Sequence, residues 1–422
     1  MNKADIAISQ GRMELLSPGG SIEKISTAFT YGADSVYMGL KDFSLRTNAK
    51  NVEYGSCEEL KAIKQKFNGK LYCTVNIYFH EDDIAKLEEK LDQISDFPFD
   101  AFILSDIGIL DVLRSKFPNA EYSLSTQANC INARSAKIYH NMGFKKVILG
   151  RETPLKDIRK IKDANPDLQI ETFAHGAMCM AYSGRCFLSS HLTGRSANYG
   201  DCSHTCRWNY RLALEEESRP GVYYPILEEN DWTTIMSSKD LCMIDHLKDL
   251  RDAGVDTLKI EGRMKSTYYV ASVTRAYRKA IDNLYDPTVD YIPYRDELYN
   301  VSHREFSTGF FYGKGPIDNA KLQDDDINKP ITNGYLRDYL FLGTVMDEIA
   351  PGVYSIDIKN QIRSGDAIEF IGPDILSIKE PSVKVLDFDM NEVQHIDHCN
   401  EGYIKTNAKL KNGYIIRKEI RL

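Results

Sequence analysis

The chain has 422 residues, a length that predicts two or three domains and allows a large buried core without disulfide staples. Apolar residues make up 42% and charged residues 27%, which excludes disorder, collagen and a coiled coil as the main architecture. With 53 Lys and Arg against 61 Asp and Glu, the net charge is −8, which excludes a surface that is basic all over but allows a local basic surface.

Short β-rich runs alternate with amphipathic stretches as far as residue 260. Most of the runs are continuously apolar or nearly so, which is typical of parallel strands that are covered by helices on one face. Eight are found: 13–16, 35–38, 71–76, 101–105, 121–125, 146–149, 169–174 and 257–260. Between and after them, helices are expected at 21–31, 57–67, 132–141, 247–253 and 267–283. Eight repeats in a row predict a TIM-type (β/α)8 barrel, with an open doubly wound sheet as the alternative.

One spacing breaks this rhythm, because the seventh and eighth strands are separated by a long insertion, residues 176–238. The insertion contains a predicted hairpin around 223–226, and it follows the carboxyl end of a strand, where barrel enzymes build their active sites. We assign residues 1–330 to the barrel domain. Beyond a linker, short strands split by Pro351-Gly352 and Ser364-Gly365 predict a small all-β barrel over residues 331–422.

Five of the nine cysteines fall between residues 179 and 242. The odd total and the lack of a signal peptide or an apolar run of about 18 residues predict a cytoplasmic protein with reduced thiols. Only Cys202 and Cys206 have the close spacing of a structural zinc site, whereas thiolates from scattered positions suit a [4Fe–4S] cluster. Buried, inert cysteines are the alternative. A radical SAM site is excluded because Asn209 stands where its third cysteine would be.

Polar residues follow nearly every predicted barrel strand, and in a barrel they would meet at one mouth. Glu152, His175 and Glu261 are candidate catalytic groups, His175 as a base with a structural histidine as the alternative. Candidates for holding a substrate, including arginines that can grip carboxylates, come from six other positions. They are Arg46, Asn76, Gln127, Arg151, Arg263 and Lys265.

Two basic segments are candidates for contact with RNA. Arg207, Trp208 and Arg211 interleave cations with an aromatic ring, a pattern that can stack on bases or can equally form a strand of the hairpin. The last 22 residues hold six Lys and Arg against two Glu, which indicates a modest basic surface or simply a solvated face.

Two strings carry a resemblance to a known family. Glu171-x-Phe173-x-x-Gly176-x-x-Cys179, with Gly184-x-Cys186-x-Leu188-Ser189, resembles the signature of the peptidase U32 family. The strings 14–21, 238–241 and 259–265 support it, so the resemblance covers nearly the whole chain.

The resemblance implies an enzyme. The family was named for collagenase-like proteolysis, but it includes oxygen-independent hydroxylases with a [4Fe–4S] cluster that modify tRNA, ribosomal RNA or ubiquinone precursors. The length and the small β domain are most similar to members that convert the tRNA wobble uridine to 5-hydroxyuridine with prephenate as oxygen source. The spacings of the cluster ligands in related members match Cys179, Cys186, Cys202 and Cys242, with Cys206 as a replacement for Cys202.

Three expectations follow from the resemblance. The implied partners are tRNA and a small dicarboxylate donor, held by Arg46, Arg151 and Arg263, with no membrane contact and with the need for a related family subunit left open. A collagenase-like peptidase is the alternative enzyme, although no motif for its nucleophile or metal was found. A subunit whose cluster is only structural is the alternative without catalysis.

Overall fold

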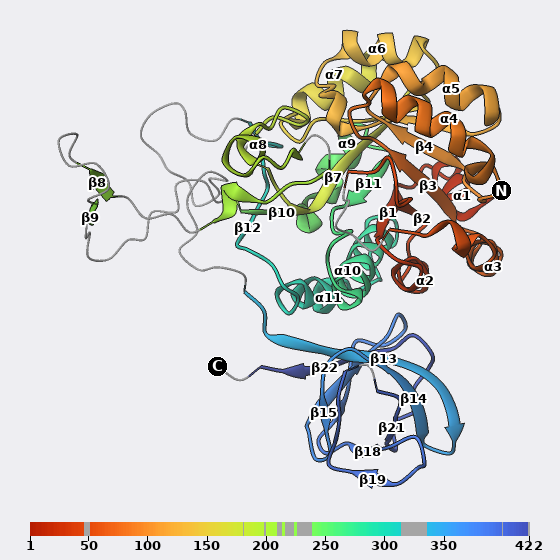
Figure 1. Ribbon diagram of the computed structural model, residues 1–422, viewed down its shortest axis with the longest axis vertical. Coiled ribbons are helices and arrows are strands. Elements are labelled where there is room, and N and C mark those ends of the chain that lie inside the picture. The colour runs from red at the N-terminus through yellow and green to blue at the C-terminus, as the bar shows by residue number, and fades with distance from the viewer. Residues whose placement is uncertain are drawn as a thin grey trace.

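A computed structural model describes residues 1–45, 51–179, 181–197, 200–208, 239–313, 336–398 and 400–420, together with two short strands at 213–215 and 223–225. Eight parallel strands form a closed barrel in which the last strand pairs with both the first and the seventh (Figure 1). They are β1 (Glu14–Gly19), β2 (Ser35–Gly39), β3 (Lys70–Val75), β4 (Ala101–Leu104), β5 (Glu121–Leu124), β6 (Lys146–Ile148), β7 (Gln169–Ala177) and β11 (Thr257–Ile260). The barrel prediction is confirmed, and every predicted barrel strand is present to within three residues at either end.

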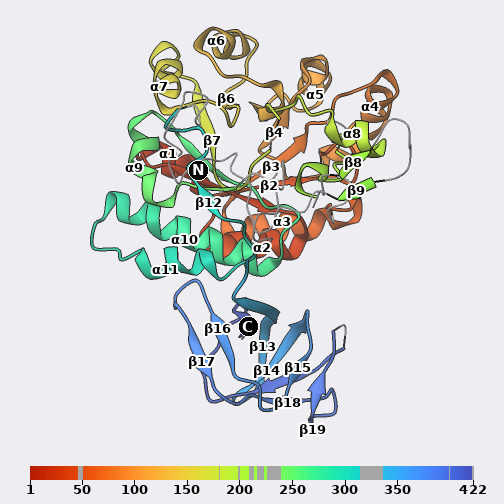
Figure 2. The same ribbon diagram turned by 90° about the vertical axis from the view of Figure 1, so that its left-hand side faces the viewer.

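Helices surround the barrel, as Figures 1 and 2 show. They are α1 (Lys3–Ser9), α2 (Ile22–Thr30), α3 (Cys57–Phe67), α4 (Glu81–Ser95), α5 (Leu110–Lys116), α6 (Ala133–Asn141), α7 (Leu155–Ala164), α8 (Leu188–Thr193), α9 (Leu247–Asp252), α10 (Thr267–Tyr285) and α11 (Ile292–Asp296). Short 3-10 turns are η1 (Tyr54–Ser56), η2 (Ile107–Ile109), η3 (Thr126–Ala128), η5 (Thr205–Arg207), η6 (Ile244–His246) and η7 (Glu297–Tyr299). Side-chain caps begin several helices; Ser21 accepts from the backbone N–H of Lys24, and Ser266 accepts from that of Tyr269.

Two short strands extend the sheet beyond the barrel. β10 (Asp240–Cys242) lies antiparallel to the end of β7, and β12 (Phe306–Ser307) pairs with β10. The predicted hairpin is confirmed as β8 (Ala213–Glu215) paired with β9 (Tyr223–Pro225). The short strands β10 and β12 were not predicted, because two or three residues carry no readable periodicity.

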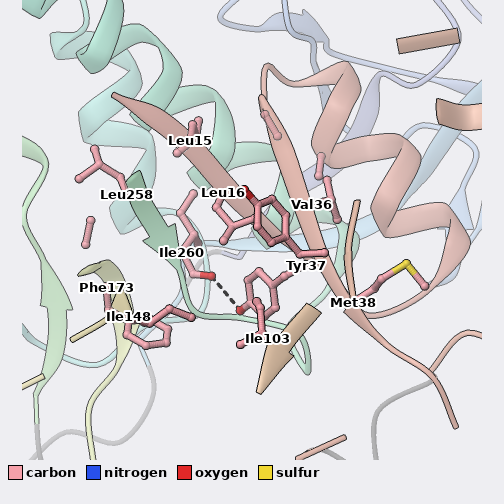
Figure 3. Packing of buried hydrophobic residues seen from close by; sticks show 14 of the residues in the cluster. Leu15, Leu16, Val36, Tyr37, Met38, Ile103, Ile148, Phe173, Leu258 and Ile260 are labelled. Carbon is pink, nitrogen blue, oxygen red and sulfur yellow. Dashed lines mark hydrogen bonds between the residues drawn. The ribbon is translucent and has the colours of Figure 1, made fainter. Parts of the chain in front are cut away.

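The barrel interior contains a buried ion pair near its base. Glu14 of β1 is fully buried, bonded to the Lys146 ammonium at 2.6 Å, and accepts hydrogen bonds from Ser35 and Thr257. Burial alone would raise the pKa of Glu14, but Lys146 and these hydrogen bonds outweigh it and hold the pKa at about 2. Figure 3 shows Tyr37, Ile103, Ile148 and Phe173 farther along the barrel, with the Tyr37 hydroxyl donating to the carbonyl of Ile260 at 2.9 Å.

The C-terminal strands form a curved antiparallel sheet around a second hydrophobic cluster. In spatial order it contains β17 (Ile378–Glu380), β16 (Ile368–Ile371), β22 (Ile415–Glu419), β13 (Tyr339–Ala350), β14 (Val353–Ile358), β21 (Tyr403–Lys405), β18 (Lys384–Leu386) and β19 (Glu392–Val393), with β15 (Ile362–Arg363) and β20 (His395–Ile396) as a separate pair. Among the described residues β17 and β19 do not pair, so the predicted small barrel is a half-barrel. The predicted boundary at 330/331 lies outside the described residues.

The small domain docks on the barrel helices α2 and α10 through buried polar contacts. The Tyr31 hydroxyl contacts the carbonyls of Ile371 and Gly413, and Arg275 of α10 donates to the carbonyls of Gly372 and Ile375. Figures 1 and 2 show this domain against α10 and α11. The contacts tie it to the flank of the barrel, away from the mouth that α8 overhangs.

Candidate active site at the barrel mouth

A cavity of about 290 Å³ opens at the carboxyl ends of the barrel strands. Its floor is formed by inward-facing residues near those ends, such as Tyr37, Thr74, Ile148 and Phe173, and its rim by the segment after β7. The site was predicted on this face, because the carboxyl ends of parallel barrel strands meet there.

A buried ammonium lies in the cavity floor. Lys259 of β11 bonds Glu171 of β7 at 2.8 Å, and its Nζ lies 4.2 Å from the centre of the Tyr37 ring. Burial lowers the pKa of Lys259, and Glu171 opposes that shift. The floor therefore presents a cation whose charge is sensitive to whatever occupies the cavity.

Two arginines line the same cavity, as predicted. Arg263 is held by hydrogen bonds from its Nη1 to the hydroxyls of Ser44 and Thr74, at 2.6 and 2.8 Å. A Cβ at position 39 would lie 2.6 Å from that Nη1, so only glycine leaves room for it. Arg151 stacks on Phe173 with its Cζ 3.7 Å from the ring centre and pairs with Glu261 at 3.2 Å. Together with Lys259 they make a cationic wall.

Two predicted polar residues also line the cavity. Asn76 accepts a hydrogen bond from the backbone N–H of Leu45. Gln127 has a buried Oε1 for which the described residues offer no donor, and its carbonyl lies against the loop at Gly184. A Cβ at position 184 would meet that carbonyl oxygen at 2.0 Å, and φ there is +73°. Glycine is therefore required for the cysteine-bearing loop to reach the cavity.

Four thiols line the cavity: Cys179, Cys186, Cys202 and Cys206. Burial raises the pKa of Cys206, Arg207 opposes the shift, and the other three sulfurs raise it further. The four groups are therefore close enough to interact electrostatically. Their number and softness fit an iron–sulfur cluster, which takes one thiolate at each corner. Among the described residues no three Cys, His, Asp or Glu side chains are placed to hold a single metal ion.

Cys242, expected as a ligand, does not line this cavity. It lies on β10 opposite His175, and its sulfur is 3.9 Å from the Tyr277 hydroxyl of α10. Burial raises its pKa to about 11. The cavity instead contains Cys206, which the sequence offered only as a substitute for Cys202.

His175, the candidate catalytic base, lies outside the cavity. It is 1% exposed and does not line the cavity; its ring faces Tyr269, Tyr277 and Phe306. Burial, only partly opposed by Asp240, lowers its pKa to about 3. The cause is a bulge between β7 and β11: Phe173 pairs with Lys259 but His175 pairs with Ile260, and the extra residue on β7 interrupts the inward alternation of 171 and 173.

Two further candidates have structural roles. The Glu152 carboxylate accepts from Asn129 and from the Ser183 hydroxyl at 3.1 Å, and so anchors the loop beside the cavity without lining it. Lys265 donates to the carbonyl of Ser302 at 2.9 Å and is also outside the cavity lining. Of the three catalytic candidates, only Glu261 lines the cavity.

The three residues predicted to contact RNA do not all lie at the cavity. Arg207 lines the cavity and Trp208 is exposed beside it, whereas Arg211, like the substrate candidate Arg46, lies outside the described residues. Three of the six cations of the basic tail are paired with acids: Arg417 is buried against Glu297 and Glu369, and carboxylates pair with Lys411 and Lys418.

Lys259 was not predicted as a site residue, and Cys206 was predicted only as a replacement for Cys202. The signal for Lys259 was present, because alternation along 257–261 places Thr257, Lys259 and Glu261 on one face of β11. No sequence signal distinguishes Cys206 from Cys242, since the position of Cys242 depends on the pairing of β10 with the distant strand β7.

The fold and cavity define a (β/α)8-barrel protein with a thiol-lined, cationic site at its mouth. Residues 20–321 match Peptidase family U32, and residues 337–417 match the Peptidase family U32 C-terminal domain. The chain belongs to peptidase family U32, as the resemblance implied.

Three relatives illustrate the range of that family. The tRNA hydroxylation protein P1 of Bacillus subtilis (strain 168) is 35% identical over 91% of this chain and 89% of its own length. The tRNA hydroxylation protein P of Escherichia coli (strain K12) is 34% identical over 85% of this chain and 86% of its own. A protein named Collagenase from Porphyromonas gingivalis (strain ATCC BAA-308 / W83) is 31% identical over 85% of this chain and 86% of its own length. In the described part of this chain no helix is long and apolar enough to cross a bilayer.

Proposed function

We propose that this chain is a tRNA-modifying hydroxylase that converts the wobble uridine to 5-hydroxyuridine, with prephenate as oxygen donor and an iron–sulfur cluster as cofactor. The observation that carries the proposal is the joint occurrence, in one cavity, of four thiols and a cationic wall. The relatives named as tRNA hydroxylation proteins match nearly the whole chain, which supports RNA as the substrate.

The cationic wall supports a dicarboxylate donor. Arg263 is fixed by Ser44 and Thr74, so it is already oriented for a carboxylate and loses little entropy on binding one. Arg151 and Lys259 provide further positive charge at the floor. Glu261, the carboxylate in the lining, is paired with Arg151 and holds that guanidinium at the cavity.

The cluster is assigned to Cys179, Cys186, Cys202 and Cys206. When bound, such a cluster supplies one-electron chemistry at the mouth of the cavity. The protein fixes the thiol-bearing loop through Glu152 and Ser183, and it shields the donor site below with the apolar ring of Phe173. Arg207 and Trp208 lie where an RNA nucleotide would enter.

Nucleoside mass spectrometry tests this function. In a bacterial strain that lacks its own tRNA 5-hydroxyuridine, the wild-type gene should restore the nucleoside, whereas Cys186→Ala should not. Cys57→Ala is the matched control, since Cys57 lies on α3 outside the cavity, and it should restore the nucleoside fully. Absence of 5-hydroxyuridine in the strain carrying the wild-type gene would refute the proposal.

A collagenase-like peptidase is the second candidate, favoured by the name of the Porphyromonas gingivalis relative. The hydroxyl closest to a carboxylate in the cavity lining is Ser183, which donates to Glu152. Cleavage of gelatin that survives Cys186→Ala but is lost in Ser183→Ala would support this function against the first.

A further inference from the structure

The rim of the cavity carries an unusual set of exposed apolar side chains. We define the mouth segment as residues 181–197 and 200–208. Within it Phe187 is 74% exposed, Tyr182 64%, Leu192 46% and Trp208 45%. Exposed large apolar groups gathered in so short a stretch are characteristic of interaction sites, because solvating them is unfavourable.

Three of these residues line the cavity or directly adjoin residues that do. Tyr182 itself lines the cavity, Phe187 lies between the lining residues Cys186 and Leu188, and Trp208 follows the lining residue Arg207. Two more exposed apolar residues, Ile107 and Met264, follow the carboxyl ends of β4 and β11 and therefore lie on the same face. The exposed apolar residues and the cavity therefore share one face of the barrel.

The charge of the mouth segment is opposite to that of the chain. It contains three arginines, Arg185, Arg195 and Arg207, against the single acidic residue Asp201, in a protein of net charge −8. Asp201 pairs with Arg195 at 2.6 Å, and Arg185 is exposed. The segment therefore offers positive charge among exposed aromatic rings.

We propose that the mouth segment is a stacking platform for unpaired nucleotides of an RNA loop, with Phe187, Tyr182 and Trp208 against bases and Arg185 near a phosphate. This inference rests on the proposed function and specifies how its substrate is held. Flat rings interleaved with arginines suit bases that are unstacked from a helix, because every base has a π face and the backbone is anionic. A fully paired duplex offers no such faces.

RNA binding by the full-length, iron-loaded chain tests the platform. Fluorescence anisotropy with a labelled anticodon stem-loop should show about tenfold weaker binding for Phe187→Ala, and a larger loss for Phe187→Ala combined with Trp208→Ala. Phe388→Ala is the matched control, since Phe388 is 63% exposed on the small domain, and it should bind as wild type does. A blunt duplex of equal length should bind weakly to all variants. Arg185→Gln should flatten the salt dependence of binding.

The possible results distinguish RNA binding by the mouth segment from the hydroxylation reaction. Unchanged stem-loop affinity in the double variant, equal loss in Phe388→Ala, or equal affinity for duplex and loop would overturn the platform. Thermal unfolding and iron content should match wild type in each variant, because the substituted side chains are exposed. A wild-type chain that restores 5-hydroxyuridine while binding no stem-loop would also overturn the platform and leave the proposed function intact.

Discussion

At the scale of single residues, the site depends on which face of a strand each side chain takes. Lys259 faces inward because it alternates with Thr257, which contacts the interior carboxylate of Glu14. His175 is displaced by the bulge that separates it from Phe173. A shift of one residue in strand register therefore moves a side chain such as that of His175 out of the cavity.

The first prediction concerns the buried ammonium of Lys259. Because burial lowers its pKa, Lys259 loses its charge as the pH rises at values below the ordinary 10.5 of lysine, whereas the arginines beside it stay charged. The KM for the donor should therefore rise with pH in this range. In Lys259→Arg the rise should vanish, and a pH profile that is the same in both forms would show that Lys259 does not hold the donor.

The second prediction distinguishes the fourth ligand. Cys206→Ser should lower the iron bound per chain and weaken the visible absorption after anaerobic reconstitution, because Cys206 lines the cavity with the other three thiols. Cys242→Ser should keep the iron, since its sulfur lies beside Tyr277. The reverse pattern would return Cys242 to the ligand set that family spacing implies.

At the scale of elements, the insertion between β7 and β11 builds the site by folding back over the mouth. β10 pairs with the end of β7. The loop around Gly184 lies against the backbone carbonyl of Gln127, a residue of η3. The barrel strands were predictable because their apolar runs and helix caps are local signals. The pairing of β10 with β7 was not, because β10 has three residues and its partner is distant in the chain.

The third prediction tests this loop. Gly184→Ala should lower iron binding severalfold, because its Cβ would meet the Gln127 carbonyl at 2.0 Å and push the loop away from the cavity. Gly194→Ala is the matched control, since φ is +72° there and no atom lies within 4 Å. It should cost only about 1–2 kcal/mol of folding free energy for the left-handed backbone and leave iron binding unchanged. Equal iron loss in both variants would assign the effect to backbone strain.

At the scale of the whole molecule, the small domain is fixed to the barrel by buried charge. Arg417 of β22 is 2% exposed, bonds Glu369 of its own domain at 2.8 Å, and bonds Glu297 and the Tyr268 hydroxyl of the barrel domain. The sequence suggested a basic tail for RNA, but charge counting cannot show that the acids partnering the tail come from distant segments.

The fourth prediction follows from that interface. Arg417→Ala should lower the free energy of unfolding by about 3–5 kcal/mol, because it leaves Glu297 and Glu369 buried without their shared partner. Lys418→Ala, which removes a more exposed pair with Asp366, should cost less than about 1 kcal/mol. Chemical denaturation measures both, and similar losses would show that the Arg417 pairs do not hold the domains together.

We propose that one cavity at the barrel mouth holds a carboxylate donor and an RNA base together for the reaction. The most direct measurement follows the oxygen atom: the anaerobically reconstituted chain is incubated with unmodified tRNA and ¹⁸O-labelled prephenate in unlabelled water, and the nucleosides are analysed by mass spectrometry. We expect 5-hydroxyuridine that carries ¹⁸O, and no such product from the Arg263→Met variant. Hydroxyuridine whose oxygen comes from water, or product formed without prephenate, would contradict this proposal.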